Sequence, residues 1–406
     1  MSTVSGHGAR DVIVVGGGPA GSATAVMLKQ SGHDVLLLDE ARFPRDKICG
    51  ESVSPEAWRL LADLGADGAV RALSPHPLRG MAVTAPDGTC FRGDYRGASH
   101  PGFALRRAQL DRVLLDRARE AGVEVREGVR ATGLLQGAAG IVEGVTAVNG
   151  SKPEAARARL VIGADGRRSV VARRLGLLRE HRRLRKFAVR GYWEGMEGLE
   201  ERGEMHGGGG GYCGVAPLSP TCANVTFVLD RREMPAAGGA LESFYRRTLR
   251  RWPRIAERLA KARLLSPPSA IGPLALEASR VSAPGALLVG DAAGFYDPFT
   301  GEGITLALRS AELAAEVADR CLRAASARAF RVLTDYDRAR HAATRHKFRF
   351  NRLLQVVVGR PWLANAAVRR LARRPDLADR MVSIAGDFVP ARTALGPGFL
   401  LDMILS

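Results

Sequence analysis

Residues 11–30 read DVIVVGGGPAGSATAVMLKQ, and this stretch decides the fold. Its first five residues are almost all apolar and β-branched, which predicts a central parallel strand buried on both faces. The glycine-rich residues 16–21 then form a turn, and the small residues that follow predict a helix to Gln30. A second buried strand is predicted at 35–38. Strand, helix and strand in this order are the βαβ opening of a Rossmann-type domain.

The turn between the first strand and the helix has the spacing G-x-G-x-x-G. Glycines there permit a tight turn, a close approach of the backbone to a pyrophosphate, and close packing of helix on strand. The helix N-terminus adds unpaired N–H groups and a positive dipole end. An acid 18 residues past the last glycine, at the end of the second strand, can bind ribose hydroxyls. The dinucleotide site expected here comprises Gly16, Gly18, Pro19, Ala20, Gly21, Asp39 and Glu40.

Two later buried strands end in aspartate-containing turns. The strand predicted at 160–163 leads into Ala164-Asp165-Gly166, and the strand at 286–289 leads into Gly290-Asp291. Residues 298–304, PFTGEGI, then open a long helix predicted over 303–321. For Asp165 an ordinary surface turn is the alternative, because Asp-Gly is common in turns.

Between these motifs the sequence pattern changes from buried strands to alternating apolar and polar residues. Residues 187–281 contain alternating stretches and many glycines, which predict an antiparallel sheet. We therefore expect an α/β (α+β) fold with three parts. These are a discontinuous cofactor-binding domain (1–80, 100–180 and 282–335), a substrate domain (81–99 and 181–281), and a C-terminal helical region (336–406).

The set of motifs resembles the p-hydroxybenzoate hydroxylase-like flavin monooxygenase superfamily. Residues 43–51, FPRDKICGE, resemble the signature of its geranylgeranyl reductase branch, which shares ancestry with flavin-dependent halogenases. The resemblance implies FAD as the cofactor and NAD(P)H as a transient reductant. It places these further residues at FAD: Arg45, Cys49, Gly50, Arg107, Asp165, Gly290, Asp291, Pro298, Gly301, Gly303 and Ile304. A helix N-terminus facing the flavin ring would stabilise the negative charge of the reduced cofactor.

Departures from the relatives bear on the substrate. Lipid-reducing members carry a Tyr-x-Trp-x-Phe-Pro motif, and the similar stretch here is Tyr212-Cys213-Gly214-Val215-Ala216-Pro217. Tyr212 and Pro217 remain, whereas Gly214 and Ala216 replace two large aromatics and would widen the pocket. The Trp-x-Trp-x-Ile-Pro motif of halogenases does not occur.

The sequence thus favours an NAD(P)H-using monooxygenase that hydroxylates an apolar or aromatic, polyketide-like compound through a flavin C4a-hydroperoxide in a water-poor pocket. A reductase of alkenes in a lipid or polyketide is the alternative, and a halogenase is third. Two weak catalytic candidates are Cys49, which is otherwise a packing residue, and His206, which is otherwise a solvated loop residue.

Composition bears on the compartment, the metal content and the partners expected for the protein. Five widely spaced cysteines and no metal-ligand spacing favour reduced thiols in a cytoplasm and no metal site. No run of about 18 apolar residues predicts a spanning helix, and residues 1–10 lack the apolar core of a signal peptide. The net charge of +18 is mostly scattered arginine, with a local cluster at 369–374. We expect no nucleic-acid binding, and at most a weak peripheral contact with a membrane.

Overall fold

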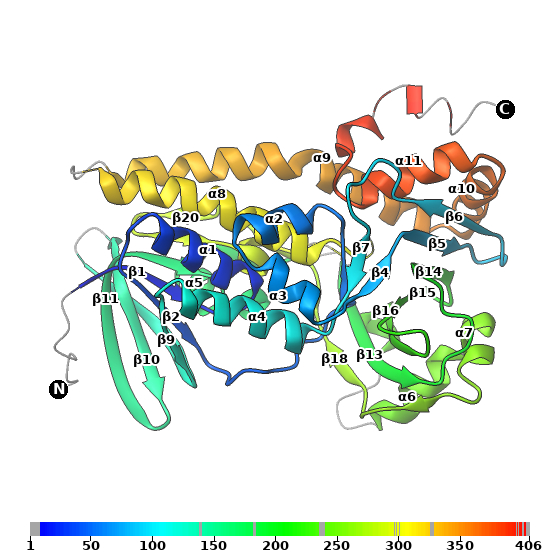
Figure 1. The fold of residues 1–406 in the computed structure, drawn as a ribbon, viewed down its shortest axis with the longest axis horizontal. Helices are drawn as coiled ribbons and strands as arrows, with labels where there is room; N and C mark the ends of the chain where they lie inside the picture. Colours follow the sequence, from blue (N-terminus) through cyan, green and yellow to red (C-terminus); the bar gives the residue numbers. More distant parts are fainter. Residues whose placement is uncertain are drawn as a thin grey trace.

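The first sheet of the protein runs through the centre of the cofactor-binding part (Figure 1). The structure is a computed structural model that describes residues 9–402, except 138–139, 182–183, 235–239, 296, 298, 300, 325–328, 395, 397, 400 and 401. Four strands of this sheet are parallel neighbours in the order β21 (Ala286–Leu288), β11 (Lys152–Gly163), β1 (Arg10–Val15) and β2 (Val35–Asp39). β8 (Glu124–Glu127) continues the parallel set beside β2, and the short β20 (Ser282–Ala283) closes the other edge.

Strands far apart in the sequence meet here because each is a short apolar run. Residues 12–15 of β1 and all of β2 and β21 are buried, as expected for strands covered on both faces. The helices that pack together around the sheet are α1 (Pro19–Gln30), α4 (Arg107–Glu120) and α8 (Gly303–Arg323). β9 (Val129–Gln136) and β10 (Val142–Asn149) extend β11 as an antiparallel arm. The predicted Rossmann-type fold is confirmed.

A second sheet lies toward the other end of the molecule from the first (Figure 1). Its order is β17 (Arg263–Leu264), β13 (Lys186–Glu194), β16 (Cys222–Asp230), β15 (Gly211–Pro217), β14 (Arg202–Gly208), β5 (Gly80–Thr84) and β6 (Cys90–Asp94), and β18 (Ser269–Ile271) also pairs with β13. All pairs are antiparallel except β14 with β5, so the sheet is mixed. Helices α6 (Leu241–Leu249) and α7 (Pro253–Arg258) cover it through a core that includes Phe227 and Tyr245.

Three helices close the fold at its C-terminal end: α9 (Thr334–Val358), α10 (Pro361–Arg373) and α11 (Pro375–Ala385). α10 and α11 pack against the outer strand β6 of the second sheet, and α9 also packs along α8 (Figure 1). The smaller elements are β3 (Ser52–Val53), α2 (Ala57–Asp63), α3 (Asp67–Ala72), β4 (His76–Leu78), β7 (Gly102–Ala104), α5 (Val170–Arg174), β12 (Leu178–Glu180) and β19 (Leu276–Ala278).

The contact between β6 and α11 leaves no space for a side chain at Gly93. A Cβ on this residue would lie 2.6 Å from the backbone oxygen of Ala378. We expect Gly93→Val to lower the free energy of unfolding by about 1–3 kcal/mol, because overpacking forces the helix away from the strand. Thermal unfolding followed by circular dichroism measures this change. The control is Gly68→Ala in α3, where a Cβ meets nothing within 4 Å. If Gly93→Val unfolds at the same temperature as that control, the packing of α11 on β6 is wrong.

Candidate cofactor and substrate site

The loops that follow β1, β11 and β21 converge at the carboxyl edge of the first sheet. Gly16 has a positive φ of 106°, and a Cβ there would lie 2.5 Å from the backbone oxygen of Ala164. A Cβ on Gly21 would lie only 1.8 Å from the Gly16 oxygen. Gly290 is as tightly placed, since its Cβ would meet that of Ala20 at 2.8 Å. Only glycine fits these positions, so the three loops form one rigid cradle.

Gly18 differs from the glycines around it. Its φ is −73°, and the only heavy atom within 4 Å of an added Cβ is an Arg45 nitrogen at 3.6 Å. The backbone of Gly18 therefore faces open space at the N-terminus of α1. That arrangement suits a phosphate group, which binds to free N–H groups at the positive end of a helix.

A large cavity begins at this turn. Its space, including the part open to solvent, is about 1560 Å³. The cavity extends from the glycine turn at the first sheet to the second sheet. Its lining at the first sheet includes these predicted residues: Gly18, Pro19, Ala20, Cys49, Gly50, Arg107, Gly290, Asp291, Gly301, Gly303 and Ile304. We call this part the cofactor cleft.

Other predicted cofactor residues lie beside or behind the cleft. The Asp39 carboxylate accepts hydrogen bonds from the backbone N–H groups of Gly17 (2.7 Å) and Ala41 (2.8 Å), so it holds the glycine turn. Glu40 is exposed. Arg45 and Arg107 both bind the buried carboxylate of Asp111. Pro298 lies outside the described residues.

Asp165 is half-buried and its Oδ1 is fully buried, so it is not part of an exposed surface turn. Its Oδ2 accepts a hydrogen bond from the Val170 N–H at 2.6 Å, while its Oδ1 has no partner among the described residues. Burial raises the pKa of this carboxyl, although hydrogen bonds from Ser169 and Val170 act in the opposite direction. A buried oxygen without a partner at the edge of the cradle is consistent with a ligand hydroxyl at this position.

Besides Arg167, which donates to the Pro273 carbonyl at 2.6 Å, two charged residues of the stretch 43–51 that sequence reasoning missed also line the cavity. Lys47 extends its ammonium to 3.8 Å from the carboxylate of Asp291, and burial lowers the pKa of this lysine. Glu51 is fully buried with a positive φ of 61°. Both residues lie within residues 43–51, and the resemblance of that stretch to the reductase signature could have identified them as cofactor-site residues.

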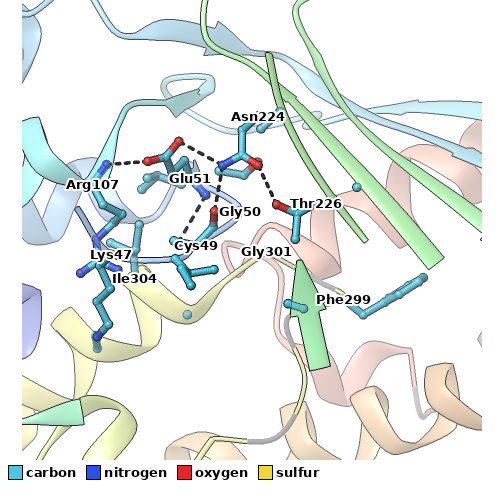
Figure 2. A pocket seen from close by; sticks show the side chains of 18 of the residues that line it. Lys47, Cys49, Gly50, Glu51, Arg107, Asn224, Thr226, Phe299, Gly301 and Ile304 are labelled. Atoms are coloured by element: carbon cyan, nitrogen blue, oxygen red, sulfur yellow. Dashed lines mark hydrogen bonds between the residues drawn. The ribbon is translucent and has the colours of Figure 1, made fainter. Parts of the chain in front are cut away.

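Glu51 joins the cleft to the second sheet. Its Oε1 accepts hydrogen bonds from the Arg107 N–H (2.8 Å) and the Tyr192 hydroxyl (2.6 Å). Its Oε2 accepts one from the Asn224 amide (3.0 Å), which also donates to the Cys49 carbonyl (Figure 2). Thr226 donates in turn to the oxygen of Asn224. Nothing in the sequence pointed to Asn224 or Tyr192.

The rest of the cavity is an apolar chamber formed by the second sheet and the segments beside it. The predicted substrate residues Tyr212, Gly214 and Ala216 line it, and Pro217 does not. A Cβ on Gly214 would have its nearest heavy atom, Met205 Cε, at 3.7 Å, so there is room for a side chain. Most of the remaining wall is apolar: Met81, Ala188, Met205, Val228, Ile271, Leu274, Phe295 and Phe299.

The polar side chain of Tyr212 in the chamber is already paired. The Tyr212 hydroxyl donates to Asp297 at 2.6 Å, and its ring packs edge-on against Phe299. Burial raises the pKa of Tyr212 far above its usual value. Cys49 lies at the boundary of chamber and cleft, where its sulfur accepts the Glu51 N–H at 3.3 Å.

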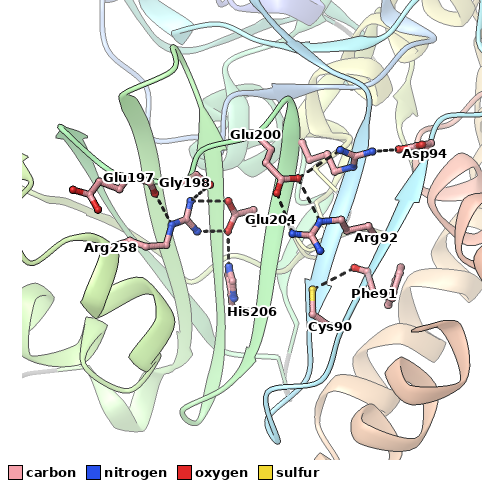
Figure 3. A network of polar contacts seen from close by, with 11 residues as sticks. Cys90, Phe91, Arg92, Asp94, Glu197, Gly198, Glu200, Glu204, His206 and Arg258 are labelled. Carbon is pink, nitrogen blue, oxygen red and sulfur yellow. Dashed lines mark hydrogen bonds and ion pairs between the residues drawn. The ribbon is translucent and has the colours of Figure 1, made fainter. Parts of the chain in front are cut away.

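His206 is a buried strand residue, so the alternative of a solvated loop residue is wrong. Its Nε2 lies 2.9 Å from Glu204 Oε2, and Arg258 binds both oxygens of the same carboxylate (Figure 3). Burial opposes ionisation of Glu204, but His206 and Arg258 outweigh it and lower the pKa of this carboxyl. Glu204 lines the cavity, whereas His206 does not. The trio stabilises β14 against α7.

Comparisons with known proteins agree with this geometry. The FAD binding domain family matches residues 9–350. Menaquinone reductase of Mycobacterium tuberculosis is 33% identical over 325 residues, which span 76% of each chain. Digeranylgeranylglycerophospholipid reductase of Methanosarcina mazei is 30% identical over 76% of this chain and 74% of its own. The structure of the myxobacterial chondrochloren halogenase CndH, an FAD-dependent enzyme, superposes with a TM-score of 0.81 at 26% identity and covers 97% of both chains.

The open face of Gly18 gives the sharpest test of the cofactor cleft. Gly18→Val should fold, because its φ and the space around it allow a side chain, but it should lose FAD through a steric clash with the pyrophosphate. Flavin absorbance per protein chain measures the loss, and circular dichroism checks the fold. Gly21→Val should instead fail to fold, because its side chain meets backbone. Stoichiometric FAD in Gly18→Val would mean that this turn does not bind phosphate.

The raised pKa of Glu51, caused first by burial, predicts a pH effect on stability. A carboxyl whose folded pKa is raised stabilises the protein fully below the pKa of the unfolded chain. That contribution is lost as the pH rises through the folded pKa. We expect the melting temperature of the wild type to fall relative to Glu51→Gln as the pH rises from about 4 toward neutrality. A difference that is constant over this range would show that Glu51 is ionised at its usual pKa.

Proposed function

We propose, on the premise that this chain belongs to the FAD binding domain family, that it is an FAD-dependent reductase that saturates a carbon–carbon double bond in a neutral, apolar compound. One observation carries the proposal: the apolar chamber opens directly onto the cofactor cleft, and most of its wall is apolar, with Tyr212 and Glu204 paired within the protein. A charged substrate is disfavoured against such a wall, since burying an unpaired charge is strongly unfavourable. A neutral, mostly apolar molecule fits it.

The residues present fit FAD. The Gly18 turn and the N-terminus of α1 would hold the pyrophosphate, and Asp291 with Lys47 would face the chain that links it to the flavin. The N-terminus of α8, at Gly303 and Ile304, would support the ring. When bound, FAD supplies hydride transfer, taking a hydride from NAD(P)H and passing it to the substrate.

Reduction of an alkene needs a proton as well as a hydride. The boundary between cleft and chamber provides two groups that can hold one, the Cys49 thiol and the Glu51 carboxyl, whose pKa is raised by burial. Two relatives at 30% identity or more are named as reductases, which also favours this reaction.

Hydroxylation is the second candidate, and a specific observation favours it. Gly214 and Ala216 line the chamber with small side chains, and a Cβ on Gly214 would have its nearest heavy atom at 3.7 Å. Substrates of flavin hydroxylation must be held in a chamber that excludes water, and the apolar wall here would do so.

The two reactions differ in their need for oxygen and in the mass of the product. Holoprotein is reduced with NAD(P)H under argon and mixed with a menaquinone that carries a short prenyl chain. We expect the flavin to reoxidise without oxygen and a product to gain two hydrogen atoms that persist after exposure to air. Air reoxidises a quinol, so a persistent gain marks a saturated alkene.

The double variant Gly214→Trp with Ala216→Phe is the matched control, because it fills the chamber and leaves the cofactor cleft intact. It should retain FAD and lose at least about tenfold in kcat/KM, since the substrate no longer reaches a reactive pose. A product that forms only in air and carries one added oxygen atom would overturn the reductase in favour of the monooxygenase. Full activity of the double variant would show that the substrate binds elsewhere.

A further inference from the structure

The corner between α9 and α10 exposes apolar side chains that no other element covers among the residues that the structure describes. Leu353 and Val356 at the end of α9 are 39% and 47% exposed, and Trp362 in the first turn of α10 is 68% exposed. The other three tryptophans of the chain, Trp58, Trp193 and Trp252, are buried. Large apolar residues gathered on a surface indicate a partner at that surface.

The same corner is strongly basic. Residues 338–375 contain eleven lysines and arginines and no aspartate or glutamate, against a net charge of +18 for the whole chain. The excess charge is thus concentrated in this segment, whereas the sequence alone suggested a mostly scattered distribution. Four of its exposed arginines, Arg345, Arg349, Arg360 and Arg373, pair with no carboxylate in the described part of the chain, whereas Arg338 and Arg369 pair with Asp335 and Asp87.

Charge and apolar groups share one helical face. On α9 the exposed positions 345, 349, 353 and 356 follow one another at steps of three or four residues, and Arg360 lies just before α10. On α10 positions 362, 366, 369 and 373 are exposed at the same spacing. Such spacing places residues on the same side of a helix. The opposite side of α10 is buried through Ala364, Val368 and Leu371.

An apolar cavity leads inward from this corner. It lies between the C-terminal helices and strands β5 and β6, and its lining includes Val357, Val358 and Ala364 next to the exposed residues. It is also lined by Met81, Met205 and Phe299, which line the apolar chamber beside the cofactor cleft as well. Residues next to the exposed corner and residues of the chamber therefore share one apolar cavity.

We propose that the α9–α10 corner, comprising Leu353, Val356, Trp362 and the surrounding arginines, docks onto an anionic membrane surface and receives the apolar substrate there. Tryptophan prefers the boundary between headgroups and acyl chains, and arginines near an anionic surface are attracted to it. No helix in the described part of the chain is long and apolar enough to cross a membrane, so the contact is peripheral. The arginines also disfavour a second copy of this chain as the occupant, because like charges would face each other.

This surface does not depend on which reaction the protein catalyses. It is tested with FAD-loaded protein and vesicles of phosphatidylcholine alone or with about one third phosphatidylglycerol. We expect co-sedimentation with the anionic vesicles only, weakened by salt because the charges lie at the surface. Acyl chains brominated near the headgroup should quench Trp362, the exposed tryptophan. Equal binding to both vesicle types, or no binding to either, would overturn the proposal.

Paired variants distinguish vesicle binding through this surface from nonspecific adsorption of the protein to vesicles. Val356→Ser with Trp362→Ser should weaken vesicle binding at least tenfold, while Leu73→Ser, another exposed apolar residue, should not. Arg349→Glu with Arg360→Glu should abolish binding, while Arg247→Glu with Arg250→Glu on and beside α6 should leave it intact. Flavin absorbance should be unchanged in all four. Unchanged vesicle binding in both corner variants, or a dimer without vesicles that Trp362→Ser dissociates, would contradict membrane docking.

Discussion

The close packing of three loops at the carboxyl edge of the first sheet is the constraint on which the rest of the structure depends. Gly16 presses against Ala164, Gly21 against Gly16, and Gly290 against Ala20, each at a distance that excludes a side chain. Residues from the beginning, middle and late parts of the chain are thereby fixed against one another. The backbone of Gly18 and the first turns of α1 and α8 then face one cavity. A less rigid arrangement would leave phosphate, ribityl chain and ring to be bound by loops that must first be ordered.

The second constraint is the buried carboxyl of Glu51. It binds the start of α4 through Arg107, β13 through Tyr192 and β16 through Asn224, so a loop of the cofactor cleft is tied directly to the second sheet. Buried carboxyls are unfavourable unless their oxygens are satisfied, and here three donors satisfy them. The apolar chamber consequently has a defined position relative to the cleft. We therefore expect the hydrogen bonds of Glu51, more than any single residue of the chamber wall, to determine where the substrate lies relative to the cofactor.

Much of the fold could be predicted because its signals are local. The apolar runs of β1, β2 and β21 and the glycine spacing at 16–21 are visible in short stretches, and the structure has strands and a turn there. The burial of His206 could not be predicted, because its partner Glu204 is held by Arg258, 54 residues away. The parallel pairing of β14 with β5 is hidden for the same reason, since the two strands are separated by over a hundred residues. The basic α9–α10 corner could be predicted only in part from the sequence, because composition does not show which arginines lack a carboxylate partner.

The central claim is that cofactor and apolar substrate occupy two ends of one cavity. Titration of the oxidised holoprotein with a neutral prenylated naphthoquinone, with the flavin absorption spectrum recorded at each step, tests this claim most directly. The account predicts a saturable change in the flavin bands, because the ligand displaces water beside the ring. Saturable binding of the quinone, measured independently by equilibrium dialysis, with no change in the flavin bands would place the apolar ligand away from the cofactor and contradict the account.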